Sequence, residues 1–130
     1  SRHLLWEYLK TYDGDIFKTK ELRMMITCGD EPVGTFDVFN LDVRNRRAEV
    51  GIFVDAAHRG VGVGETALQI AKRYAREVLG LNQIYATVAC RNHLALNVFR
   101  NAGFAETAEL TEWLVCEGTF CGALLLQCKL

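Results

Sequence analysis

With 130 residues, half of them hydrophobic, the chain is long enough for one domain with one hydrophobic core. The formal net charge is −1, so the composition provides no basic surface for nucleic acid. The apolar stretches are interrupted well short of the ~20 residues that a membrane-spanning helix needs. These properties favour a single domain that acts on small ligands, not on nucleic acid or a membrane.

The cysteines are five in number and lack a Cys-x-x-Cys pair; they are Cys28, Cys90, Cys116, Cys121 and Cys128. An odd count without histidines at zinc-ligand spacing argues against a metal site. The chain also does not open on a signal-peptide pattern, so we expect a reducing cytoplasm, with the thiols as buried hydrophobic side chains.

The first half of the chain is predicted to hold one helix and three strands. Apolar residues at helical spacing (Leu4, Leu5, Tyr8, Leu9) predict a helix over residues 4–12 that stops near Asp13-Gly14. The β-rich runs 22–28 and 33–40 flank the turn-forming residues 29–32, which predicts an antiparallel hairpin. A third strand is expected over residues 47–54.

A glycine loop follows the third strand, where residues 58–64 read His-Arg-Gly-Val-Gly-Val-Gly. The helical pattern after it extends from Val63 to Leu79 and is ended by Gly80. Glycines allow the backbone to approach a ligand closely, and the first turn of a helix has unpaired N–H groups at the positive end of its dipole. The loop therefore predicts a site for a diphosphate.

The rest of the chain is predicted to form a strand, a helix and a late hairpin. The strand covers residues 83–90, and Asn92 is the expected N-cap of the helix. Strands over about 104–116 and 119–129 then turn at Glu117-Gly118.

The order of residues in the glycine loop narrows the choice of ligand. A Walker A loop ends in Gly-Lys-Ser/Thr, whereas this loop ends in Gly64-Glu65-Thr66. A dinucleotide fingerprint follows its strand directly and has a carboxylate ~20 residues on, and neither feature is present.

The pattern Arg-x-x-Gly-x-Gly at Arg59, Gly62 and Gly64 resembles the acetyl-CoA pyrophosphate loop of the GNAT N-acetyltransferases. A second block, residues 92–104, resembles that family's Asn-x-x-Ala-x-x-x-Tyr-x-x-x-Gly-Phe segment. Shorter similarities in residues 22–26, 34–37 and 47–52 resemble the branch of spermidine and ribosomal-protein-alanine acetyltransferases. The resemblance covers roughly residues 20–130.

This resemblance implies an α/β (α+β) fold of the GNAT acyl-CoA N-acyltransferase type, as one domain over residues 1–130. The family's sheet is mixed and mostly antiparallel, has helices on both faces, and holds the cofactor in a notch, here expected between strands 47–55 and 83–90. The family usually has a strand and a helix before the helix expected at 4–12, so the chain is expected to be N-terminally short.

Acetyl-CoA, as co-substrate and without a metal, is the cofactor that the resemblance implies. Main-chain groups of Ile52, Phe53 and Val54 match the strand that binds the pantetheine arm. The pyrophosphate cradle matches Arg59, Gly60, Val61, Gly62, Val63, Gly64 and Glu65. Asn92 is expected to contact the arm as well as to cap its helix.

The resemblance also assigns candidate catalytic positions. Glu49 matches a glutamate that acts as base in some members of the family, although a solvated carboxylate at a strand end is an equal alternative. Glu109 and Glu112 match acidic residues on the acceptor side, or are simply polar residues of a half-exposed strand. Phe99 stands where the family has a tyrosine that protonates the leaving thiolate, and its ring is expected to face the cofactor sulfur. His58 and His93 have no evident partner in the sequence.

The implied activity is acetyl transfer from acetyl-CoA to a primary amine by direct attack in a ternary complex. The acceptor would be a polyamine, a protein N-terminus or another small amine, and a homodimer is possible by analogy with the family. Because phenylalanine cannot donate a proton, the alternative is a non-catalytic acyl-CoA-binding or regulatory module.

Overall fold

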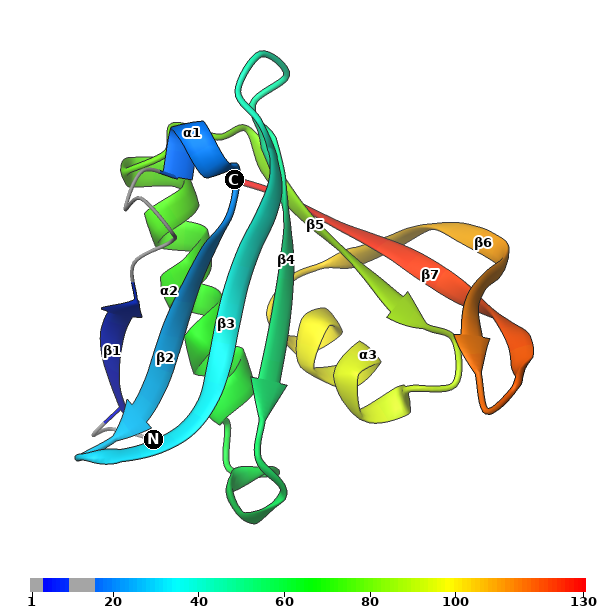
Figure 1. Ribbon diagram of the computed structural model, residues 1–130, viewed down its shortest axis with the longest axis horizontal. Coiled ribbons are helices and arrows are strands. Elements are labelled where there is room, and N and C mark those ends of the chain that lie inside the picture. The colour runs from blue at the N-terminus through cyan, green and yellow to red at the C-terminus, as the bar shows by residue number, and fades with distance from the viewer. Residues whose placement is uncertain (1–3, 10–15) are drawn as a thin grey trace.

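The computed structural model describes residues 4–9 and 16–130 (Figure 1). In chain order the elements are β1 (Leu4–Leu9), α1 (Ile16–Thr19), β2 (Leu22–Cys28), β3 (Glu31–Asp42), β4 (Arg47–Val54), the 3-10 turn η1 (Ala56–His58), α2 (Val63–Glu77), β5 (Gln83–Ala89), α3 (His93–Asn101), β6 (Ala105–Cys116) and β7 (Thr119–Lys129). Within this part of the chain the strands form one seven-stranded sheet in the order β1-β2-β3-β4-β5-β7-β6. Every neighbouring pair is antiparallel except β4 and β5, which run parallel.

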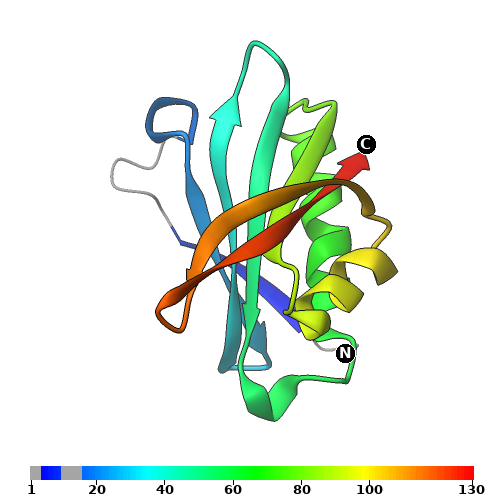
Figure 2. The ribbon, with the colours of Figure 1, turned by 90° about the vertical axis from the view of Figure 1, so that its right-hand side faces the viewer.

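The hydrophobic core lies between the sheet and helices α2 and α3. Along β2 and β4 the buried residues alternate with more exposed ones, as expected where one face of a sheet is covered. Helix α2 contributes Leu68 and three alanines, Ala67, Ala71 and Ala75, whose small side chains allow it to approach the sheet closely. Helices α2 and α3 lie on the same side of the sheet, and the four-residue α1 lies on the opposite side (Figures 1 and 2).

The predicted helix over residues 4–12 is wrong, because residues 4–9 form strand β1. Its register with β2 runs from Leu4 opposite Cys28 to Leu9 opposite Arg23. A short apolar run fits a strand as well as a helix, and here the free edge of β2 supplies hydrogen-bond partners for the backbone. The expected end of the helix, at residues 10–14, lies outside the described residues.

The other predicted elements are confirmed with small changes at their ends. β2 and β3 form the expected antiparallel hairpin, and β3 is longer than predicted because it extends to Asp42. β6 and β7 turn at Glu117 and Gly118, whose φ angles of 52° and 80° are those of the tight turn that suits a hairpin. Asn92 accepts a hydrogen bond from the N–H of Ala95 at 3.2 Å, which confirms it as the N-cap of α3.

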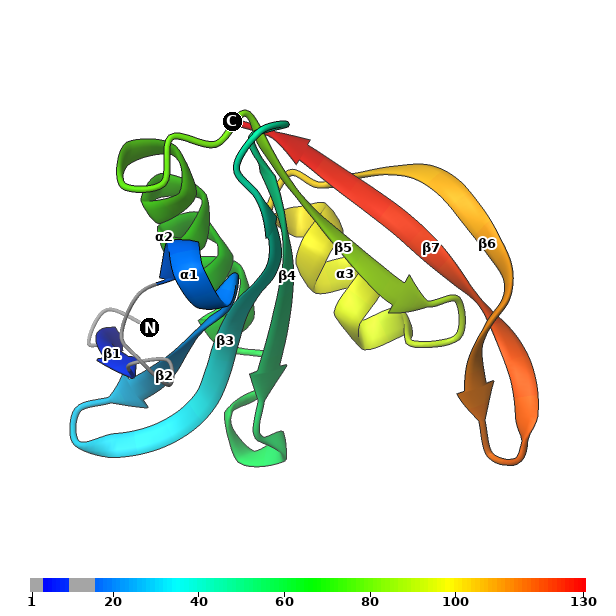
Figure 3. The ribbon, with the colours of Figure 1, turned by 45° about the horizontal axis from the view of Figure 1, so that its top comes forward.

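Strands β4 and β5 pair over three residues and then diverge. Their parallel register contains Arg47 with Gln83, Ala48 with Ile84, and Glu49 with Tyr85. On its other side, β5 pairs with β7 along its whole length. Beyond Glu49, β4 remains paired with β3 but no longer with β5. Figure 3 shows the two strands separating, with α3 beside the space between them. This confirms the expected position of the notch.

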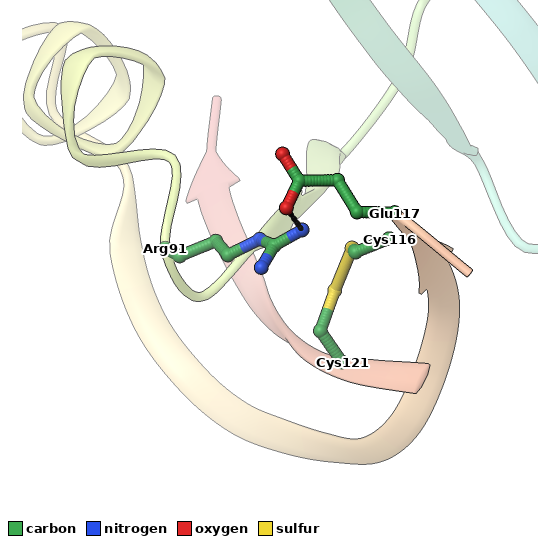
Figure 4. The surroundings of a disulfide bond; sticks show 4 residues. All are labelled: Arg91, Cys116, Glu117 and Cys121. Carbon is green, nitrogen blue, oxygen red and sulfur yellow. Dashed lines mark ion pairs between the residues drawn. A yellow bond between two sulfur atoms is a disulfide. The ribbon is translucent and has the colours of Figure 1, made fainter. Parts of the chain in front are cut away.

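The expectation that all the thiols are buried hydrophobic side chains is wrong for Cys116 and Cys121, which form a disulfide across the β6–β7 turn (Figure 4). Their spacing of five residues spans a tight hairpin and brings the two Cα atoms to 6.0 Å. Cys128 is buried, while Cys28 and Cys90 are only half-buried. Beside the disulfide, Arg91 lies 3.8 Å from Glu117, so the hairpin end contacts the segment that leads into α3.

Gly34 on β3 has no room for a side chain against the backbone of β4. A Cβ at this position would run into the carbonyl oxygen of Phe53, a backbone atom that cannot rotate away. We expect Gly34→Ala to lower the free energy of unfolding by about 2 kcal/mol or more. Gly51→Ala on β4 is the matched control, because a Cβ there meets only the Phe39 ring at 3.5 Å. Chemical denaturation of both variants checks this, and equal losses would contradict it.

Candidate functional site

A cavity of about 520 Å³ lies beside the end of β4, beyond the point where the pairing of β4 with β5 stops. Its walls come from three segments that are distant in sequence: the end of β4, the loop leading into the N-terminus of α2, and the first half of α3. The lining residues are Ile52, Phe53, Val54, His58, Arg59, Gly60, Gly62, Val63, Gly64, Glu65, Asn92, Leu94, Ala95, Asn97 and Val98. The structure thus brings every predicted cofactor residue to one cavity except Val61, whose side chain is exposed.

The glycine loop presents backbone to this cavity. Gly60 and Gly62 have φ angles of 78° and 84°, a left-handed conformation that favours glycine. A Cβ at either position would meet nothing within 4 Å, so the space beside them is open. Gly62 is also the N-cap of α2 and has no side chain that could bond the N–H groups of the first helical turn. The arrangement fits an anion held by backbone N–H groups at the positive end of the helix.

Gly64 has a different role, because it allows α2 and α3 to pack closely. A Cβ at Gly64 would lie 2.9 Å from a methyl group of Val98. Further along the same interface, Lys72 donates a hydrogen bond to the carbonyl of Ala102 at 2.9 Å, and Gln69 does so at 3.3 Å. These contacts fix the two helical walls of the cavity relative to each other.

Arg59 folds back onto the end of β4. Its Nε donates to the carbonyl oxygen of Val54 at 2.9 Å, and its guanidinium carbon lies 5.9 Å from the centre of the exposed Phe53 ring. The cationic group therefore lies along the strand edge that faces the notch. On the opposite wall, Leu94 is 67% exposed and adds apolar surface together with Ala95 and Val98.

Glu49 lies outside the cavity, where β4 and β5 still pair. Its Oε1 accepts a hydrogen bond from Nδ2 of Asn40 at 3.0 Å. Asn40 has a φ of 51° and lies at the register shift between Phe39 and Asp42. The residue that bonds Glu49 is therefore part of a β-bulge. Asn40 gave no signal in the sequence, because a β-bulge cannot be read from it.

Tyr85 stands opposite Glu49 on β5. Burial, followed by the negative charge of Glu49, raises the pKa of Tyr85 above its ordinary value, although Arg47 opposes this. The sequence analysis missed this residue, since a tyrosine in a strand is usually a packing residue. The register of β4 with β5 is what places its side chain beside the carboxylate.

Phe99 does not line the cavity, contrary to the expectation that its ring faces the cofactor. The side chain is only 3% exposed, and its ring packs edge-on against Phe104 with the ring centres 5.0 Å apart. Glu109 and Glu112 on β6 are exposed and also lie away from the lining. Oε1 of Glu109 is 3.9 Å from the sulfur of Cys90.

His58, which has no evident partner in the sequence, has two in the structure. Its Nδ1 lies 2.6 Å from Oδ1 of Asp55, and its Nε2 lies 3.4 Å from Oε1 of Glu31. The aspartate three residues earlier was the one available signal. The glutamate is brought there by the β2–β3 hairpin, so it could not be inferred locally.

Two further properties concern the described ranges 4–9 and 16–130 as a whole. They contain no helix that is long and apolar enough to cross a membrane. Nor do they bring three or more His, Cys, Asp or Glu side chains together in a group that could hold a metal ion.

The fold and the loop-to-helix cavity define an acyltransferase-type architecture, and comparison with known proteins gives the family. Residues 2–104 match the family described as "Acetyltransferase (GNAT) family", and the chain belongs to it.

Among curated relatives, a spermidine N(1)-acetyltransferase of Escherichia coli K12 is 28% identical over 113 residues, which cover 87% of this chain and 61% of that protein. The enzyme of the same name from Vibrio cholerae is 26% identical over 115 residues, covering 88% of this chain and 66% of that protein. The chain therefore spans about three fifths to two thirds of the length of these relatives.

Solved structures show the same fold. Vibrio cholerae spermidine N-acetyltransferase in complex with CoA and spermine superimposes with a TM-score of 0.87 at 19% identity, over 99% of this chain and 95% of that chain. A dodecameric structure of the spermidine N-acetyltransferase from that organism gives a TM-score of 0.87 at 18% identity, with the same coverage of both chains.

Proposed function

We propose that the protein is an acetyl-CoA-dependent N-acetyltransferase that acts on a primary amine. The observation that carries the proposal is the cavity in which the N-terminus of α2 and its glycine loop face the separated end of β4. A phosphorylated, elongated ligand matches this shape, since an anion site lies at one end and a free strand edge at the other. Membership of the GNAT family supports the same ligand.

The residues present fit acetyl-CoA. The diphosphate would lie against the backbone of Gly60 and Gly62, beside which the structure leaves open space. Residues 52–54 pair with β3 on one side only, so their other main-chain groups are available to the pantetheine arm. The carbonyl of Val54 already accepts one hydrogen bond, from Arg59, which shows that this edge is accessible to a donor.

The chemistry requires a neutral amine that attacks the thioester carbon. A carbon–nitrogen bond forms, the carbon–sulfur bond breaks, the amine loses a proton, and the thiolate leaves. For a lysine-like amine with a pKa of ~10.4, neutrality at pH 7 costs roughly 4.6 kcal/mol, whereas an α-amine near ~7.8 costs about 1 kcal/mol. A base therefore matters most for polyamine or lysine-like acceptors, and we assign it to Glu49, oriented by Asn40.

The leaving thiolate needs less assistance. If its pKa resembles that of cysteine, near ~8.5, leaving without a proton donor costs only about 2 kcal/mol at pH 7. Phe99 has no proton to donate and is buried against Phe104, so water is the donor in this scheme. The same observation favours a second candidate function, a non-catalytic acyl-CoA-binding module.

Release of free thiol from acetyl-CoA decides between the two functions. The acceptors to compare are polyamines, peptides with a free amino terminus, and aminoglycosides. Acceptor-dependent thiol release supports the enzyme. Tight acetyl-CoA binding without release for any amine supports the binding module. The names of the relatives make spermidine the first polyamine to test. Light scattering of the same sample measures its oligomeric state and so tests the homodimer suggested by the resemblance to the family.

Gly62→Asp is expected to abolish measurable acetyl-CoA binding in calorimetry, because the new carboxylate would occupy and repel the diphosphate site. Gly118→Asp is the matched control: it adds the same group at a φ of 80°, likewise with no neighbour of a Cβ within 4 Å, but in the β6–β7 turn. Loss of binding in both variants, or in neither, would contradict the assignment of the diphosphate site to the glycine loop.

Glu49→Gln is expected to lower turnover by about 10²-fold or more while acetyl-CoA affinity stays nearly constant. The loss should be largest below the pKa of the amine, where a base is most needed. The pH–rate profiles of the wild type and the variant provide the measurement. Glu77→Gln, at the C-terminal end of α2 and paired with Arg73, serves as the control. Superimposable profiles for Glu49→Gln would mean that the base lies elsewhere.

A further inference from the structure

His58 occupies a junction between the cavity and the β2–β3 hairpin. It is the last residue of the 3-10 turn η1 and the first residue of the glycine loop, and it lines the cavity together with Arg59 and Gly60. Its ring is 25% exposed. Asp55 on one side belongs to the same turn, whereas Glu31 on the other side is the first residue of β3.

Both ring nitrogens of His58 therefore face a carboxylate oxygen. A neutral imidazole has one N–H and can donate to only one of them, whereas an imidazolium donates to both. The hydrogen bond to Asp55 is the main cause that raises the pKa of His58 above its ordinary value. The charges of Asp55 and Glu31 act in the same direction, and partial burial opposes them. The charged form is thus the one that the surrounding groups favour.

We propose that protonated His58 is a positioning residue for the CoA diphosphate, because it ties the 3-10 turn at the start of the glycine loop to β3 and neutralises the two carboxylates that contact it behind the cavity lining. The inference rests on the acetyl-CoA site proposed above. It adds a pH dependence to cofactor binding.

The balance of charge around the glycine loop supports this role. Apart from His58, the charged residues that line the cavity are Arg59 and Glu65. The guanidinium of Arg59 lies against Phe53 and the Val54 carbonyl. Asp55 and Glu31 do not line the cavity themselves but contact His58, which does. When His58 is neutral, these two carboxylates lose their cationic partner, and their uncompensated negative charge opposes the binding of an anionic diphosphate.

The direction of the effect follows from the raised pKa. Below that pKa His58 is charged, the junction is intact and acetyl-CoA binds most tightly. As the pH rises through the pKa, the imidazolium is lost and affinity falls. Folding stability follows the same sign: the contribution is fully present below the unfolded pKa of about 6.5 and is lost as the pH rises through the higher folded value.

The test is calorimetric titration of the protein with acetyl-CoA between about pH 5.5 and 8.5, in the range where histidine titrates. For the wild type we expect Kd to rise roughly three- to tenfold over this range. This is the size expected when one charge, that of the His58 imidazolium, acts on the diphosphate through partly solvated surroundings. In His58→Gln the Kd should be nearly constant and close to the high-pH value of the wild type. Acetyl-dephospho-CoA should give the same curve, which excludes titration of the 3′-phosphate.

Glu31→Gln distinguishes this role from a purely structural one. Removal of that carboxylate lowers the pKa of His58, so the midpoint of the Kd curve should shift to lower pH. The titration of the His58 ring, followed by NMR without ligand, should shift in the same direction. His93→Gln on α3 is the control and should behave as the wild type.

A wild-type Kd that is independent of pH while acetyl-CoA still binds would overturn the inference and leave the proposed function standing. An unshifted midpoint in Glu31→Gln would also overturn it. Absence of acetyl-CoA binding in the wild type at every pH would overturn the proposed function and the inference with it.

Discussion

The early end of pairing between β4 and β5 is the constraint on which the site depends. After Glu49 and Tyr85 the two strands separate, so a sheet that is otherwise continuous has an unpaired edge in its middle. Unpaired main-chain groups inside a protein require partners. At the end of β4 the carbonyl of Val54 receives one from Arg59. A ligand with amide groups could provide such partners along the same edge.

The divergence also determines where the helices lie. α2 follows β4 through the glycine loop and packs beneath the sheet, so that its N-terminus lies at the open end of the notch (Figure 3). α3 follows β5 and lies beside α2, in contact through Gly64 and Val98. One backbone feature therefore brings together a strand edge, a helix N-terminus and an apolar wall. All the residues that line the cavity come from the end of β4, the loop and first turn of α2, and the segment 92–98 at the start of α3.

The sequence was sufficient for those parts of the fold that depend on local patterns. The glycine loop, the Asn92 cap and the Glu117-Gly118 turn each follow from the chemistry of one or two residues. Prediction failed where tertiary pairing decides: residues 4–9 are a strand because the edge of β2 was free, and Cys116 meets Cys121 because a hairpin brings them together. The same reason explains the missed site residues, whose partners come from other strands.

The two faces of the sheet have different electrostatic environments, and the proposed reaction uses one for the cationic amine and the other for the anionic cofactor. Ala48 and Val50 are buried on the face covered by α2, so Glu49 between them points to the opposite face. The proposed anion site at the N-terminus of α2 is on the helical side, and the Glu49 carboxylate is on the side from which an amine would approach. In the proposed reaction a cationic acceptor would be attracted toward Glu49, while a diphosphate would be held at the loop. The two substrates would meet only through the notch between β4 and β5, where the thioester would lie.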